Sequence, residues 1–196
     1  MEDREIIGQC QKGELKQFGL LYDKYAKKIY DFVYFKTWHK ETAEDIVSQV
    51  FMKGLESVKK FDPDKGTFSA WLYAIARNTV IDYYRVKKAD VNIEDVWDLG
   101  LPAGKAGEHV DLDSAIDARD TLEKVKKYLG KLEPTQREIV IMRVWQEMPY
   151  EEIAEALGKS AESCRMSFSR VMAKLRAEMP LLELIILFAL WIFKKY

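Results

Sequence analysis

The stretch PYEEIAEALGKSAESCRMSFSRVMAKL, residues 149–175, predicts two helices joined by a tight turn. Gly158 tolerates the positive φ that such a turn requires, and the Ser160 hydroxyl is suited to cap the second helix by accepting a backbone N–H. Apolar residues at helical spacing form the inner faces: Ile153, Ala154, Leu157, Cys164, Phe168, Val171 and Leu175. This pattern is typical of a helix-turn-helix, with an ordinary helical hairpin as the alternative.

The second helix of this motif leaves a different set of residues on its outer face: Glu162, Arg165, Met166, Ser169, Arg170 and Ala173. Arginine pairs with O6 and N7 of guanine in the major groove. A helix that presents Arg and Ser in its N-terminal half is therefore suited to reading duplex DNA.

A second informative stretch is FDPDKGTF, residues 61–68, followed by a helix expected over 67–88. Trp71, Asn78 and Arg85 lie along one face of that helix with Asp82, and Arg77 lies at its edge. Rings stack on unpaired bases, amides read base edges and Arg neutralises phosphate, so this face is apt for single-stranded DNA.

Phe61 precedes that helix and could line a pocket for an unpaired base. The structural alternative makes Trp71 and Tyr73 partly core aromatics and leaves Arg85, Lys87 and Lys88 as an exposed helix end.

The chain as a whole predicts an all-α fold of two small helical domains. Hydrophobic residues make up 48% of its 196 residues, which is enough for a core, and no alternating β-branched run predicts a strand. Helices are expected over 2–12, 14–38, 41–60, 67–88, 113–130, 134–147, 150–157 and 161–178. The first four can close a small bundle. Residues 89–112, rich in Asp, Glu, Gly and Pro, predict a flexible acidic linker.

Charge and composition exclude several classes of protein. A net charge of -1 argues against a protein that binds DNA alone, because such proteins are usually more basic. It suits a protein that binds DNA in a complex with a larger, basic partner. Cys10 and Cys164 suggest no disulfide, and the N-terminus lacks the order of a signal peptide, so we expect a cytoplasmic protein. His39 and His109 are the only histidines, and no catalytic motif occurs, so no enzyme, metal site or cofactor is expected.

Two stretches together resemble the extracytoplasmic-function sigma factors of RNA polymerase. ETAEDIVSQVFMKGLESVKKFDPDKGTFSAWLYAIARNTVIDYYR (41–85) resembles their second region, and LEPTQREIVIMRVWQEMPYEEIAEALGKSAESCRMSFSRVMAKLR (132–176) resembles their fourth. The resemblance implies a region 2 domain at 1–88, the linker at 89–112, a region 4 helix-turn-helix domain at 113–178 and a hydrophobic tail at 179–196.

The resemblance also implies a role for individual residues. The residues implied for docking on core RNA polymerase are Asp45, Gln49, Phe51 and Lys53. Those implied for recognising and melting the −10 element are Phe61, Trp71 and Asn78, with Arg77, Arg85 and Lys88 as phosphate contacts. Those implied for the −35 element are Arg165, Met166, Ser169 and Arg170.

The resemblance implies several partners: core RNA polymerase, promoter DNA and an anti-sigma factor. The linker is implied to thread toward the RNA exit path, where its carboxylates would imitate RNA phosphates; a solvated spacer is the alternative. The family often has a small hydroxyl residue at 166 and a basic one at 167, whereas this chain has Met166 and Ser167. Its recognition helix therefore carries less positive charge than is common. We expect a monomer when the protein is free.

The tail LLELIILFALWIFKKY, residues 181–196, falls outside the usual family pattern. Its apolar run is shorter than the roughly 20 residues that a membrane span needs. Three interpretations compete: a helix folded back on the protein, a membrane-surface or partner-binding anchor, and a poorly ordered end.

Two other functions are compatible with parts of the sequence. One is a helix-turn-helix regulator without sigma activity, associated with the membrane through the tail. The other is a membrane-linked adaptor that uses its helical bundle for protein contacts. The segment 41–85 favours a sigma factor over both, because neither needs a polymerase-docking helix together with a base-trapping helix.

Overall fold

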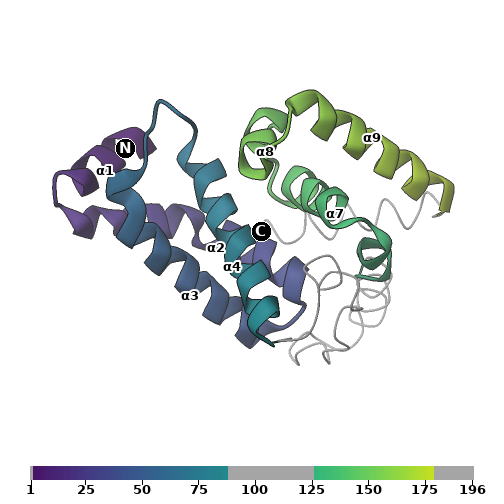
Figure 1. Ribbon diagram of the computed structural model, residues 1–196, viewed down its shortest axis with the longest axis horizontal. Helices are drawn as coiled ribbons and strands as arrows, with labels where there is room; N and C mark the ends of the chain where they lie inside the picture. The colour runs from purple at the N-terminus through teal and green to yellow at the C-terminus, as the bar shows by residue number, and fades with distance from the viewer. Residues whose placement is uncertain (1, 88–125, 179–196) are drawn as a thin grey trace, which may run out of the picture.

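Four helices form the N-terminal unit of the computed structural model, which describes residues 2–87 and 126–178 (Figure 1). They are α1 (Asp3–Gln11), α2 (Phe18–Thr37), α3 (Lys40–Ser57) and α4 (Phe68–Lys87). A short 3-10 turn, Leu15–Gln17, precedes α2, so the helix expected over 14–38 is two elements. Another 3-10 turn, Val58–Lys60, ends the segment expected as one helix over 41–60.

The C-terminal unit begins with a helical segment at 126–131. It continues with α7 (Pro134–Val140), a π-helical turn (Ile141–Trp145), α8 (Tyr150–Leu157) and α9 (Ala161–Glu178). Residues 2–87 and 126–178 contain no strand. The expected all-α fold with two helical domains is confirmed. The linker, residues 113–125 of the helix expected over 113–130, and the tail lie outside the described residues.

The apolar stripes expected from the sequence form the core of each unit. The stripe of α2 is buried along its length: Phe18, Leu21, Tyr25, Ile29, Phe32 and Val33. On α4, Phe68, Leu72, Ala76 and Thr79 are buried, and on α9, Cys164, Val171 and Leu175. Because each helix is amphipathic, burying these stripes leaves the opposite faces, which carry the candidate DNA contacts, in solvent.

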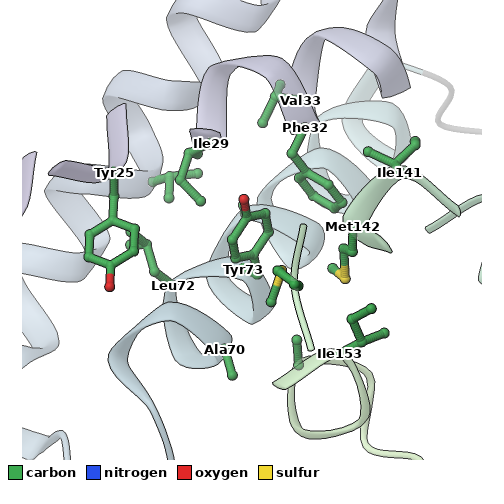
Figure 2. Packing of buried hydrophobic residues seen from close by; sticks show 14 of the residues in the cluster. Tyr25, Ile29, Phe32, Val33, Ala70, Leu72, Tyr73, Ile141, Met142 and Ile153 are labelled. Atoms are coloured by element: carbon green, nitrogen blue, oxygen red, sulfur yellow. The ribbon is translucent and has the colours of Figure 1, made fainter. Parts of the chain in front are cut away.

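The two units pack directly against each other, and their buried residues form one continuous cluster. Figure 2 shows Phe32 and Tyr73 of the N-terminal unit in the same cluster as Met142 and Ile153 of the C-terminal unit. The ring of Phe35 on α2 lies 4.6 Å from that of Trp145, centroid to centroid. Helix α8 lies against α4, as Figure 1 shows.

A group of three charges, two of them buried, crosses the boundary between the units. Glu138 of α7 forms an ion pair with Lys36 of α2, and its Oε2 accepts a hydrogen bond from Arg77 Nε of α4 at 3.0 Å. The side chain of Lys36 is 0% exposed and that of Glu138 is 2% exposed. Burial lowers the pKa of Lys36 to about 8, and the carboxylate of Glu138 opposes this shift. One anion thus compensates two cations where the two units meet.

Candidate nucleic-acid interface

A cavity lies at the N-terminal end of α4, on the surface expected to hold an unpaired base. Its volume is about 310 Å³, and its walls include Phe61 and Trp71. These two rings lie 5.1 Å apart, centroid to centroid, and Phe61 is also held edge-on by Phe68 at 5.8 Å. The Thr67 hydroxyl caps α4 by accepting a hydrogen bond from the backbone N–H of Ala70 at 3.1 Å. The cap fixes the first turn of α4 and so positions Trp71 over the cavity.

The polar residues of this face extend from the cavity along α4. Asn78 and Arg85 are exposed, and Arg85 pairs with Asp82 across one turn at 3.5 Å. Lys53 of α3 also approaches Asp82 at 3.8 Å and donates a hydrogen bond to Thr79 at 3.1 Å. The face therefore combines an aromatic pocket, an amide and the expected cation Arg85, to which the fold adds Lys53 of α3.

Three further residues were considered at or beside the −10 surface: Arg77, Tyr73 and Lys88. Arg77 donates a hydrogen bond to Glu138 of the C-terminal unit, and its side chain remains 35% exposed, so its role as a phosphate contact stays a prediction. Tyr73, considered as a partly buried aromatic, is 1% exposed and belongs to the core. Lys88 lies outside the described residues.

The expected polymerase-docking residues divide into exposed and buried positions on α3. Asp45, Gln49 and Lys53 are exposed. Phe51 is 5% exposed and packs edge-on against the rings of Phe18 and Tyr22, so it belongs to the core of this unit, and its docking role stays a prediction. Its burial has a simple cause: position 51 continues the apolar stripe of α3, one residue after Val50.

The helix-turn-helix has the geometry expected from its sequence. Gly158 ends α8 with φ of 63° and ψ of 39°, a left-handed conformation that glycine adopts without steric cost. The Ser160 hydroxyl accepts a hydrogen bond from the backbone N–H of Ser163 at 3.2 Å and caps α9. The residues of the outer face expected to read DNA are all exposed: Arg165, Met166, Ser169 and Arg170.

A groove of about 600 Å³ beside α9 adds two cations that were missed from the sequence, Arg143 and Arg176. The guanidinium of Arg143 lies 4.8 Å from the ring centre of Tyr150, and that of Arg165 lies 5.2 Å from it, so the ring holds two cations near each other. Arg176 follows Arg165 by 11 residues, which places it on the same helical face, and extending the outer-face pattern would have found it. Arg143 precedes the motif, so only folding brings it there.

The described residues were also considered for a metal site and for a membrane-spanning helix. Within residues 2–87 and 126–178, no group of His, Cys, Asp or Glu is placed to hold a metal ion. None of the helices in these ranges is both long and apolar enough for a membrane span. Burial raises the pKa of the Cys10 and Cys164 thiols, which keeps them in the less reactive protonated form.

Comparisons with known proteins agree with this geometry. Residues 21–89 match the family model of Sigma-70 region 2, and residues 122–175 match that of Sigma-70, region 4. The RNA polymerase sigma factor YlaC of Bacillus subtilis is 30% identical over 160 residues, which cover 81% of this chain and 90% of YlaC. The chain belongs to the RNA polymerase sigma factors.

Further relatives specify the subfamily. The ECF RNA polymerase sigma factor BldN of Streptomyces coelicolor is 30% identical over 176 residues, 90% of this chain, and the chain spans 65% of the length of BldN. The sigma factor CnrH of Cupriavidus metallidurans is 28% identical over 89% of this chain and 93% of CnrH. A solved structure of CnrH in complex with the cytosolic domain of CnrY superimposes with a TM-score of 0.67 and 26% identity over 89% of this chain and 95% of that one.

The chain is therefore an ECF sigma factor, and this membership assigns it to promoter-specific initiation of transcription. Sigma factors are initiation factors, so membership supports a role without catalysis. The helix-turn-helix regulator without sigma activity is not favoured, because a match to region 2 accompanies the match to region 4.

Proposed function

We propose that this sigma factor recognises a −10 element and a −35 element in promoters, and that it melts the DNA at the −10 element. In this proposal the cavity of α4 receives an unpaired base of the −10 element, which stacks against the aromatic wall formed by Phe61 and Trp71, while Asn78 reads an exposed base edge. The observation that carries the proposal is the aromatic cavity at the capped end of α4, continued by an exposed amide and Arg85. Base stacking on aromatic side chains contributes about 1–3 kcal/mol per base, enough to hold an unpaired base.

The −35 element would be read by α9 in the major groove. Arg165, Met166, Ser169 and Arg170 are exposed together on that helix, which supports direct contact with base edges. Arg143 and Arg176 would add phosphate contacts from the groove, partly offsetting the limited positive charge of the recognition helix.

Core RNA polymerase would dock on the exposed face of α3. Asp45 and Gln49 are four residues apart on that face, and Lys53 lies one further turn along. An anti-sigma factor is proposed as a second protein partner, because the similar structure of CnrH was solved with the cytosolic domain of CnrY. A protein that works with polymerase and promoter DNA would act in the cytoplasm.

Run-off transcription with core polymerase and a randomised promoter library tests the proposal. The full chain should select templates that share two short elements, one near −10 and one near −35. Arg165→Ala should weaken selection at the −35 element and leave the −10 element unchanged. Lys127→Ala, which removes an exposed positive charge from the same unit, is the matched control. A chain that supports no transcription with any template would refute the proposal.

A further inference from the structure

The loop that carries Phe61 is held by the end of α1. It follows the 3-10 turn Val58–Lys60 and leads to α4, and Phe61 forms part of the cavity wall. Gln11, the last residue of α1, is half-buried beside this loop. Its Nε2 donates hydrogen bonds to the backbone carbonyl of Phe61 at 2.7 Å and to that of Val58 at 3.3 Å. The amide of Gln11 thus uses both of its N–H donors on the loop.

These two bonds brace one turn of the backbone. The backbone N–H of Phe61 donates to the carbonyl of Val58 at 3.2 Å, so Gln11 binds the first and the last carbonyl of the same turn. Phe61 has an extended conformation, with φ of -68° and ψ of 131°. Rotation about ψ would swing its carbonyl away from Gln11, so the hydrogen bond opposes that rotation. Gln11 therefore restrains the backbone from which the Phe61 ring reaches the cavity.

The place of the Phe61 ring depends on this backbone. The ring is 8% exposed and lies 5.1 Å from that of Trp71 and 5.8 Å from that of Phe68, centroid to centroid. Aromatic contacts of this kind depend on the tilt and offset of the rings. A displaced backbone at residue 61 would change both contacts and the shape of the cavity wall. Gln11 does not itself line the cavity, so its effect on a bound base would pass through Phe61.

A second contact between α1 and the loop is weaker. Arg4 forms an ion pair with Asp64, but the two side chains are 68% and 74% exposed. Exposed ion pairs contribute little to stability, because solvent screens them and two long side chains must be ordered. The half-buried amide of Gln11 is therefore the contact of α1 that restrains the loop most.

The far end of the loop is held by the other unit. The backbone N–H of Thr67 donates to Oε1 of Glu155 on α8 at 2.8 Å, and the Thr67 hydroxyl caps α4 at Ala70. These contacts restrain the start of α4. The end of the loop at Phe61 is positioned by Gln11, which belongs to the same unit as the cavity wall.

We infer that Gln11 is a positioning residue for base capture, which sets the place of the Phe61 ring in the cavity wall. The inference rests on the proposed function, because it assigns a role in the proposed capture of the −10 base. Gln11 precedes residues 21–89, which match the region 2 model, so the inference gives α1 a part in promoter recognition. Without its two hydrogen bonds the ring would be less preorganised, and a stacked base would be held less tightly.

A double-mutant cycle on polymerase holoenzyme containing the full chain tests the inference. The probe is a fluorescein-labelled single strand that carries the selected −10 sequence, and fluorescence anisotropy gives its dissociation constant. Gln11→Met keeps the length of the side chain and removes both donors, so it should weaken binding about three- to tenfold. In a Phe61→Ala background, Gln11→Met should weaken binding by less than about twofold, because the ring that it positions is gone.

Two further variants control for general effects of the substitution. Gln17 is a half-buried glutamine in the 3-10 turn before α2, so Gln17→Met makes the same chemical change nearby and should bind the strand as the unmodified chain does. Gln11→Glu keeps the shape of the side chain but offers the carbonyls no donor, and it should weaken binding as Gln11→Met does. Urea unfolding establishes that each variant is folded under the conditions of the assay.

The outcomes separate the two proposals. Binding by Gln11→Met equal to that of the unmodified chain would overturn the positioning role, as would a loss that persists in full in the Phe61→Ala background or that Gln17→Met reproduces. In each of these cases a loss caused by Phe61→Ala alone leaves the proposed function standing. If Phe61→Ala binds the strand as the unmodified chain does, the proposed stacking fails and the positioning role fails with it.

Discussion

Replacing Glu138 by Gln should destabilise the protein far more than the same replacement at Glu155. Both carboxylates join the two units, but the Glu138 side chain is 2% exposed, whereas Glu155 is exposed. The comparison therefore holds the chemistry of the substitution constant and varies the burial of the charge.

The expected magnitude follows from the groups that Glu138 compensates. With Glu138 present, burial sets the pKa of Lys36 to about 8, so the ammonium is mostly charged at pH 7. Without the anion, Lys36 must become neutral on folding, at an extra cost of about 1–2 kcal/mol at 1.36 kcal/mol per pKa unit. The hydrogen bond to Lys36 becomes a neutral one and that from Arg77 loses its anionic acceptor, at about 0.5–1 kcal/mol each. The total loss is about 2–4 kcal/mol, against less than about 1 kcal/mol for Glu155→Gln.

Urea unfolding at pH 7 and pH 9 measures this difference. The folded pKa of Lys36 lies below its unfolded value of about 10.4, so folding favours the neutral amine, and its penalty on stability is fullest below pH 8 and fades as pH rises toward 10.4. At pH 9 the amine is largely neutral in the fold with or without Glu138. The loss caused by Glu138→Gln should therefore shrink by about 1 kcal/mol between pH 7 and pH 9. Equal, small losses for both variants at pH 7 would show that Glu138 does not compensate Lys36.

Two further substitutions test local features. The hydroxyl of Tyr73 is buried and makes no hydrogen bond within the described residues, so Tyr73→Phe should raise the free energy of unfolding by up to about 1 kcal/mol in urea titrations, and a loss of stability would contradict this account. Gly158→Ala should lower the melting temperature, because a left-handed residue with a Cβ costs about 1 kcal/mol; an unchanged melting temperature would show that the turn relaxes.

Much of the fold could be predicted from the sequence because local periodicity determines it. The stripe from Phe18 to Val33 is buried as expected, and Gly158 and Ser160 form the turn and cap that their residue types favour. The helices end within a residue or two of the expected positions where a cap or turn signal marks them. The π-helical turn at Ile141–Trp145 carries no such signal, and the segment reads as an ordinary helix.

The packing between the units could not be predicted, because it depends on pairs far apart in sequence. Lys36 and Glu138 are separated by 102 residues, and no local pattern joins them. A hint was present, since Lys36 continues the apolar stripe that includes Phe32 and Val33, and a charge on such a stripe requires a buried partner. For the same reason the sequence predicts Arg77 only as a phosphate contact, whereas in the structure Arg77 donates a hydrogen bond to Glu138.

Capture of an unpaired base by the aromatic cavity of α4 can be followed as opening of the −10 element. The assay is 2-aminopurine fluorescence in the −10 element of the selected promoter, with polymerase holoenzyme containing the full chain or its variants. Tyr30→Ala, an aromatic truncation on α2 away from the cavity, is the control.

We predict that the unmodified chain and Tyr30→Ala open the −10 element, and that Trp71→Ala reduces opening by about fivefold or more, since stacking contributes about 1–3 kcal/mol. Opening by Trp71→Ala that equals that of the unmodified chain, in a variant shown by urea unfolding to be folded, would contradict the account.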